Sequence, residues 1–328
     1  MEMKSKNSQL SKISSVGPIR LIKENIGVII GFLLVFVILS FATDKFLTIS
    51  NLSNVLRQVT MNMILSCGLG VVLIYGAIDL SVPAILGMTA CLSVGFIDRQ
   101  SMHWIVACIC ALFFALLVGA FNGFLVTRTT IPPFIITLAM QNVCRGICRV
   151  YTGEKTIVLA DKSYIFIGSG SVMGIPIQAF WILAAVLATA FLLRRTTLGR
   201  HIYAAGGNRQ AAVYSGINVN KVGMFVYMFA AFMAGMAGIY TAGRTFAAMY
   251  TTGERAETNA ISAIVLGGIS MSGGVGGIFG VVFGVFLIGI LNNGLNLLSI
   301  DSSWQYIVQG VVIIAAVCID FLRKQKRV

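Results

Sequence analysis

The stretch IGVIIGFLLVFVILSFA, residues 26–42, is 17 residues long and contains no charged side chain. A helix that crosses the ~30 Å hydrocarbon core of a bilayer needs about 17–25 apolar residues. The next residues, Thr43, Asp44 and Lys45, do not form a small-residue cleavage site. We therefore interpret this stretch as a retained first membrane helix and not as a removable signal peptide.

The composition of the whole chain extends this interpretation. Of its 328 residues, 57% are hydrophobic and 11% are charged, whereas soluble domains average roughly 45–50% apolar and 25% charged residues. The 35 glycines suit membrane helices, which use small residues for close packing. The composition predicts an all-α fold, a polytopic bundle of membrane helices.

Apolar periodicity predicts about ten transmembrane helices. They are expected at about 26–42, 52–76, 80–97, 104–126, 134–150, 177–194, 222–243, 257–271, 274–298 and 304–322. Ten crossings place both ends on one side. With cytoplasmic termini, fifteen of the 24 Lys and Arg fall on the inner side and nine on the outer side, as the positive-inside rule requires. We thus expect a cytoplasmic N-terminal segment 1–25, a membrane domain 26–322 and a basic cytoplasmic tail 323–328.

The net charge of +13 does not indicate a nucleic-acid partner, because the basic residues lie mainly at the termini and in one internal loop rather than in one patch. The seven cysteines all fall in apolar stretches and suggest no disulfide framework. Cys144 and Cys148 have no histidine or carboxylate nearby, so we expect them to pack in the core and expect no metal site.

Catalytic motifs are not evident in the sequence. It contains no phosphate-binding loop of the type G-x-x-x-x-G-K-[ST]. Its two histidines, His103 and His201, have no nucleophile and carboxylate at a recognisable spacing. We expect no enzymatic activity, no catalytic residue and no cofactor bound by this chain.

Ion-coupled transporters usually carry ionisable residues within the membrane. Here only Asp79 and Asp320 adjoin apolar runs among the acidic residues, and Asp320 lies beside the basic tail. Ion coupling is therefore disfavoured, although Asp79 keeps it open. The near absence of fixed charge expected along the pathway favours a neutral polyhydroxyl cargo.

Asp79 and Ser81 lie in the sequence LIYGAIDLSVP, residues 73–83, where Gly76 ends one apolar run and Pro83 opens the next. One interpretation is a helix cap, because Asp and Ser bind free backbone N–H groups and Pro is tolerated in a first turn. The other places Asp79 at a helix break beside a translocation pathway. The two roles are compatible.

Asparagines form the second polar feature within the apolar runs. Asn292, Asn293 and Asn296 lie in LNNGLN, and Asn122 lies in the similar FNG. Amides donate and accept hydrogen bonds, as sugar hydroxyls do. The alternative is a structural role, in which these side chains join neighbouring helices.

The inner loop of residues 194–221 contains TTLGRHIYAAGGNRQAAVYSGINVNK. Start and stop signals predict a short amphipathic helix from Arg209 to Tyr214, capped at Asn208 and ended by Gly216. Such a helix is either a surface for a soluble partner or an ordinary interfacial helix anchored by Arg and Tyr.

From about Ile26 to Leu322 the chain resembles the permeases of bacterial ABC importers for ribose, xylose, galactose, arabinose and related sugars. The segments that carry the resemblance are GAIDLSV at 76–82, GRHIYAAGGNRQAAVYSGINV at 199–219, AISAIVLGGISMSGGVGGIFG at 260–280 and LNNGLNLL at 291–298.

The resemblance implies that the loop carries the docking signal E-A-A-x-x-x-G for the ATPase subunits. It identifies the docking residues as Gly199, Arg200, Arg209, Gln210, Ala211, Ala212 and Gly216. Gln210 stands where the family usually has Glu, which removes a charge from that position. Pro83 stands in V-P-A-I, where relatives often have Gly and Ser, and should stiffen the start of its helix.

The resemblance further implies an alternating-access importer in the bacterial cytoplasmic membrane. Its expected partners are cytoplasmic ABC ATPase subunits that bind ATP and Mg, a second and identical permease subunit, and an extracytoplasmic sugar-binding protein received near residues 145–176 and 244–256. Asp79, Ser81, Asn122, Asn292, Asn293 and Asn296 are the candidate pathway residues. Other cargoes (a nucleoside, a furanosyl signal or a branched-chain amino acid), an ion-coupled secondary transporter, and a membrane enzyme or scaffold remain alternatives.

Overall fold

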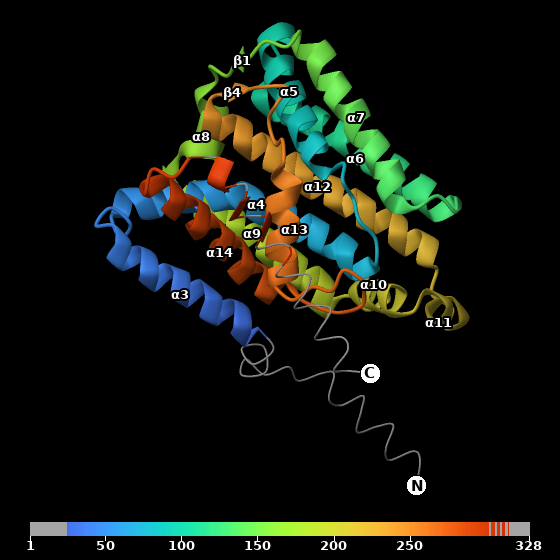
Figure 1. Cartoon of the computed structure of the whole chain (residues 1–328). Helices are drawn as coiled ribbons and strands as arrows, with labels where there is room; N and C mark the ends of the chain where they lie inside the picture. Colours follow the sequence, from blue (N-terminus) through green and yellow to red (C-terminus); the bar gives the residue numbers. More distant parts are fainter. Residues whose placement is uncertain (1–24, 302, 306, 309, 312–313, 315–328) are drawn as a thin grey trace.

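The computed structural model describes residues 25–301, 303–305, 307–308, 310–311 and 314 (Figure 1). The expected N-terminal segment before Asn25, most of the tenth span and the basic tail lie outside these residues. The helices are α3 (Ile26–Ala42), α4 (Ile49–Tyr75), α5 (Val82–Gln100), α6 (Trp104–Arg128), α7 (Pro133–Thr152), α8 (Lys162–Ser169), α9 (Ile177–Arg195), α10 (Thr197–Gly207), α11 (Arg209–Tyr214), α12 (Val219–Thr245), α13 (Ala256–Leu266) and α14 (Ile278–Leu297).

Six of these helices, α4, α5, α6, α9, α12 and α14, are long and apolar enough to cross a membrane. The predicted multi-pass helical protein is confirmed, whereas the number ten and the side of the termini stay predictions. Helix α3 is apolar but has 17 residues. Helix α7 has 20 residues and carries several polar side chains, which are described below.

The predicted span at 257–271 differs from the structure. Helix α13 has 11 residues and ends at Leu266, so it is about 16 Å long, roughly half the thickness of the hydrocarbon core. Gly267 and Gly268 follow, and Gly268 has a φ of 83°, which a β-carbon disfavours. The backbone then continues without helix to Ile278. This segment, residues 267–277, is called the α13–α14 break.

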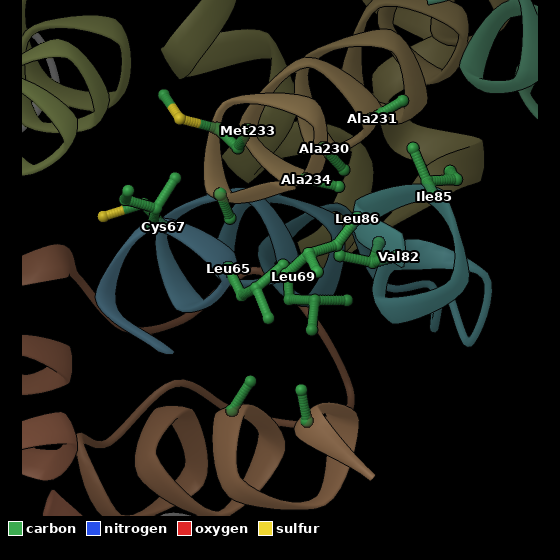
Figure 2. Close-up of a cluster of buried hydrophobic side chains, with 14 of the residues drawn as sticks. Leu65, Cys67, Leu69, Val82, Ile85, Leu86, Ala230, Ala231, Met233 and Ala234 are labelled. Carbon is green, nitrogen blue, oxygen red and sulfur yellow. The ribbon is translucent and has the colours of Figure 1, made fainter. Parts of the chain in front are cut away.

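Helix α12 packs against α4, α5, α6 and α8. Figure 2 shows part of its contact with α4 and α5, which consists of buried apolar side chains: Leu65, Cys67, Leu69, Val82, Ile85, Leu86, Ala230, Ala231, Met233 and Ala234. Gly68 makes this approach possible, since a β-carbon there would lie 2.9 Å from that of Met233. Small residues thus set the distance between α4 and α12.

Apolar side chains also cover much of the outside of the bundle. In α6, Phe113 and Phe121 are exposed, and Phe191 is exposed in α9. In water such a surface would drive aggregation, but in a bilayer it contacts lipid chains. The exposed apolar side chains therefore agree with a membrane environment.

Four two-residue strands lie between the described helices: β1 (Ile157–Val158), β2 (Ser171–Val172), β3 (Ile175–Pro176) and β4 (Ala247–Ala248). Strand β1 pairs with β4, with Ile157 opposite Ala248. The two loops expected to receive a binding protein are therefore hydrogen-bonded to each other. In Figure 1 they lie at the top, at the opposite end of the bundle from α10 and α11.

Candidate translocation and docking sites

Helix α4 ends at Gly76, whose φ of 88° is left-handed, and α5 begins at Val82. Between them, Asp79 Oδ1 accepts hydrogen bonds from the Ser81 backbone N–H at 2.9 Å and from Ser81 Oγ at 2.5 Å. Asp79 therefore fixes the turn just before α5. It does not cap the helix as expected, because Ser81 is the N-cap residue and no side chain accepts a hydrogen bond from a first-turn N–H. Pro83 lies in the first turn of α5, where its missing N–H is tolerated.

Three of the six candidate pathway residues lie together around this break. Asn122 of α6 donates from Nδ2 to Ser81 Oγ at 2.9 Å, and Asp79, Ser81 and Asn122 are all completely buried. Asp79 Oδ2 and Asn122 Oδ1 have no hydrogen-bond partner, and neither does the buried hydroxyl of Tyr227 on α12. An unsatisfied buried polar group costs about 1–3 kcal/mol. These two oxygen atoms and the Tyr227 hydroxyl would therefore gain from binding a further hydrogen-bonding group.

The asparagines of α14 lie elsewhere. Asn293 and Asn51 of α4 exchange two amide hydrogen bonds of 2.9 and 3.0 Å, which is the structural role weighed for them. Asn296 is exposed and accepts from Gln305 at 2.7 Å, and Asn292 is half-buried. Asn51 and Tyr75 are 24 residues apart on α4, about 36 Å along the helix. The α14 asparagines are therefore far from Asp79.

A polar face of α7 is the feature that sequence reasoning missed. Gln141, Arg145 and Arg149 recur every four residues, so they share one side of the helix. Arg145 donates from Nη1 to the carbonyl oxygens of Thr252 at 2.7 Å and Tyr250 at 3.1 Å. Arg149 lies over the Tyr250 ring, 5.6 Å from its centroid.

Arg145 also joins this face to the start of α5. Its Nη2 lies 3.4 Å from the carbonyl oxygen of Pro83, four residues beyond Asp79. Residues 249–255, which connect β4 to α13, thus fold back into the bundle against α5 and α7. Gly253, with a φ of 77°, forms part of this connection, and a β-carbon there would lie 2.8 Å from the Pro83 carbonyl oxygen.

A cavity of about 440 Å³ lies between α7 and the beginning of α13. Its lining is polar and contains both signs of charge: Gln141, Asn142, Arg145, Gly146, Arg149, Glu254, Arg255 and Glu257. The Oε2 atom of Glu257 is buried without a hydrogen-bond partner. Such a lining can bind hydroxyl, carboxylate or ammonium groups of a small polar molecule.

Almost no fixed charge was expected along the pathway, although Arg145 and Arg149 fall within the helix expected at 134–150. The structure places Arg145 within α7 and gathers Glu254, Arg255 and Glu257 opposite it. The four-residue spacing in α7 was the signal that could have found this face. No sequence pattern indicates that residues 249–255 fold back against α7, because Arg145 binds their backbone carbonyl groups and not their side chains.

The predicted helix of the inner loop is confirmed as α11, with Ala211 N–H bound to Asn208 Oδ1 at 3.0 Å and Gly216 at a φ of 80°. Of the seven expected docking residues, two are buried: Gly199 and Ala212. The other five are exposed: Arg200, Arg209, Gln210, Ala211 and Gly216. The exposed side chains of Val213 and Tyr214 extend this surface. We call these two residues and the five exposed docking residues the α11 face.

Tyr203 connects α10 to the rest of the bundle. Its hydroxyl donates to the Gly276 carbonyl oxygen at 2.7 Å. Burial raises the pKa of the Tyr203 phenol above its ordinary value near 10, so the hydroxyl keeps its proton and remains a donor. Among the described residues, no group of three or more His, Cys, Asp or Glu is placed to hold a metal ion.

Residues 51–317 match the family described as "Branched-chain amino acid transport system / permease component". The chain belongs to this family. Among curated relatives, the permease is 39% identical to a ribose import permease protein of Bacillus subtilis, over 91% of this chain and 93% of the relative.

Further relatives show the range of the resemblance. The permease is 36% identical to a D-allose transport system permease protein of Escherichia coli, over 86% of this chain and 87% of the relative. It is 32% identical to a xylose transport system permease protein of Haemophilus influenzae, over 92% and 98%. No solved structure matches this chain significantly.

Proposed function

We propose that this chain is the membrane-spanning permease subunit of an ATP-driven importer for a neutral monosaccharide, a ribose-like pentose or a hexose, in the bacterial cytoplasmic membrane. The names of the relatives above, which refer to ribose, D-allose and xylose transport, support this cargo class. ATP and Mg bind to a separate ATPase subunit, and the permease itself supplies the alternating-access pathway.

The observation that carries the proposal is the polar cavity between α7 and α13. Exposed polar groups in a membrane helix usually face a water-filled path or the bundle interior, and Asn142 and Arg149 of α7 are exposed. A volume of about 440 Å³ falls in the usual range of small-molecule sites. Gln141 and Asn142 can donate and accept as sugar hydroxyls require, and Glu257 Oε2 can accept from one.

The two ends of the bundle suit different partners. We assign the α11 face to the cytoplasmic ATPase, because it is an exposed surface on a short helix held by α10. The paired loops at β1 and β4 form the extracytoplasmic surface for a sugar-binding protein. A second copy of the permease completes the pathway, since the cavity lies at the surface of a single chain.

A branched-chain amino acid is the second candidate cargo. The family description names this class, and a cavity with both arginine and glutamate side chains could bind a carboxylate and an ammonium group of one molecule. The sugar permeases among the relatives support the monosaccharide. Uptake measurements distinguish the two.

The test is uptake by vesicles that contain the permease, its ATPase and its binding protein, with an ionophore present. We expect ATP-dependent uptake of labelled ribose or another monosaccharide and no uptake of leucine. Replacing Asn142 by Leu should lower uptake about fivefold, since a neutral hydrogen bond contributes about 1 kcal/mol. The matched control is Val143→Ala, because Val143 is the exposed apolar neighbour of Asn142.

Three outcomes would contradict the proposal in different ways. Leucine uptake in place of sugar uptake would select the amino-acid cargo. Uptake that needs an ion gradient but no ATP would show a secondary transporter. Equal sugar uptake by the Asn142 and Val143 variants would remove the cavity from the pathway.

A further inference from the structure

The end of α10 meets two helix breaks at a contact made of glycine backbone. Gly76 ends α4, Gly206 lies in the last turn of α10, and Gly273 and Gly274 belong to the α13–α14 break. These segments are more than 60 residues apart in sequence at each step. We call this contact the glycine joint.

Each glycine in the joint occupies space that a side chain would fill. A β-carbon on Gly206 would overlap the Ile74 carbonyl oxygen and lie 2.7 Å from the Gly274 nitrogen. One on Gly273 would lie 2.7 Å from Gly76 Cα and 2.8 Å from the Gly206 carbonyl oxygen. The three backbones are therefore in direct contact, with no side chain between them.

Hydrogen bonds join the same three segments. The Gly274 N–H donates to the Ile74 carbonyl oxygen at 2.8 Å, in the last turn of α4, where the carbonyl groups have no donor within the helix. Tyr203 donates to the Gly276 carbonyl oxygen at 2.7 Å. The α13–α14 break is thus bound on one side to α4 and on the other to α10.

The joint also connects to both polar sites. On one side, Gly76 is three residues before Asp79. On another, the α13–α14 break continues directly from α13, whose beginning lines the polar cavity. Helix α11 follows α10 after the single residue Asn208.

We propose that the glycine joint, with Tyr203 as a positioning residue, transmits displacement of α10 to the two helix breaks and so couples ATP hydrolysis to opening of the pathway. The proposal rests on the proposed function, and it adds the residues through which coupling passes. A contact without intervening side chains has little freedom to absorb a movement, because no rotamer can adjust. Displacement of α10 must therefore move the end of α4 and the break together.

Adjacent glycines provide a matched pair of variants. Gly206→Ala places a methyl group against Ile74 and Gly274, whereas Gly207→Ala has only Gly274 Cα near its new methyl group, at 4.0 Å. Both substitutions add the same group to the same helix. Tyr203→Phe is a milder variant that removes the hydrogen bond to Gly276 and keeps the ring.

The experiment measures three quantities in the assembled transporter: ATPase subunit co-purified, ATP hydrolysed, and sugar taken up. We expect Gly206→Ala to retain the ATPase and to lower sugar taken up per ATP about tenfold, within the usual range of coupling between sites. Tyr203→Phe should lower the same ratio about threefold, since one neutral hydrogen bond is lost. Gly207→Ala should match the unmodified permease in all three quantities.

If Gly206→Ala and Tyr203→Phe leave the ratio of sugar taken up to ATP hydrolysed unchanged, the proposed role of the glycine joint is wrong. Loss of the ATPase from Gly206→Ala, but not from Gly207→Ala, would overturn it as well, since Gly206 would then serve docking. If Gly206→Ala does not assemble in the membrane, the Tyr203→Phe ratio decides alone. If the unmodified permease shows no ATP-driven uptake, the proposed function is wrong, and the coupling role of the glycine joint is wrong with it.

Discussion

Asp79 holds the turn before α5 with one carboxylate oxygen and leaves the other without a partner. Its Oδ1 atom accepts from the Ser81 N–H and hydroxyl, which fixes the turn before α5. Its Oδ2 atom is buried without a partner, and Asn122 of α6 donates to the Ser81 hydroxyl. The sequence predicted the helix break because Gly76 and Pro83 mark it locally, but the expected side-chain cap of α5 is not formed. No local signal showed that Asn122 of α6 would bind Ser81.

Replacing Asp79 separates its hydrogen bonds to Ser81 from a role for its charge. Asp79→Asn keeps an Oδ1 acceptor, so we expect near-normal thermal stability and sugar uptake. Asp79→Ala loses both bonds to Ser81 and should lower the free energy of unfolding by about 1–3 kcal/mol, since buried donors lose their acceptor. Melting in detergent and vesicle uptake measure the two effects. If a stably folded Asn variant loses all uptake, the charge is required and ion coupling returns as an explanation.

At the scale of elements, the sequence predicted helix ends correctly where capping or glycine residues at the end itself determine them. The Asn208 cap, the 209–214 helix and Gly216 of the inner loop were predicted and are confirmed. Helix α13 covers only the first part of the crossing predicted at 257–271, because it ends at Leu266. Apolar composition alone cannot distinguish a half-length helix followed by an irregular, glycine-rich segment from one full span.

Only one side of the polar cavity could be predicted from the sequence. Its α7 side has a four-residue spacing that can be read in the sequence. Its other side depends on Arg145 binding the carbonyl oxygens of Tyr250 and Thr252. Backbone carbonyls exist at every residue, so no sequence pattern indicates which of them an arginine will bind.

The α11 face yields a prediction about docking. Ala211 is exposed and its neighbour Ala212 is buried, so a large side chain has different effects at the two positions. Ala211→Trp should abolish ATPase co-purification and leave the melting temperature of the permease unchanged. Ala212→Trp should lower that temperature as well, since overpacking typically costs about 1–3 kcal/mol. Normal ATPase binding by Ala211→Trp would remove the docking assignment.

For the whole molecule, the inner and outer assignments of its two ends are open to direct measurement. Lys155 and Arg200 are both exposed, one beside β1 and one on α10, so each can be replaced by cysteine. In intact cells we expect an impermeant thiol reagent to label Lys155→Cys and to reach Arg200→Cys only after permeabilisation. The unmodified permease gives the background from native thiols. The reverse pattern would invert the topology.

The pairing of β1 with β4 also has a consequence for synthesis of the chain. Ile157 pairs with Ala248, a residue that the ribosome adds 91 positions later. At about 5–20 residues per second, strand β1 waits about 5–18 s for its partner. During that time the ribosome adds α9 and α12, the two membrane-length helices between the strands. The small sheet therefore forms only after both helices have been synthesised.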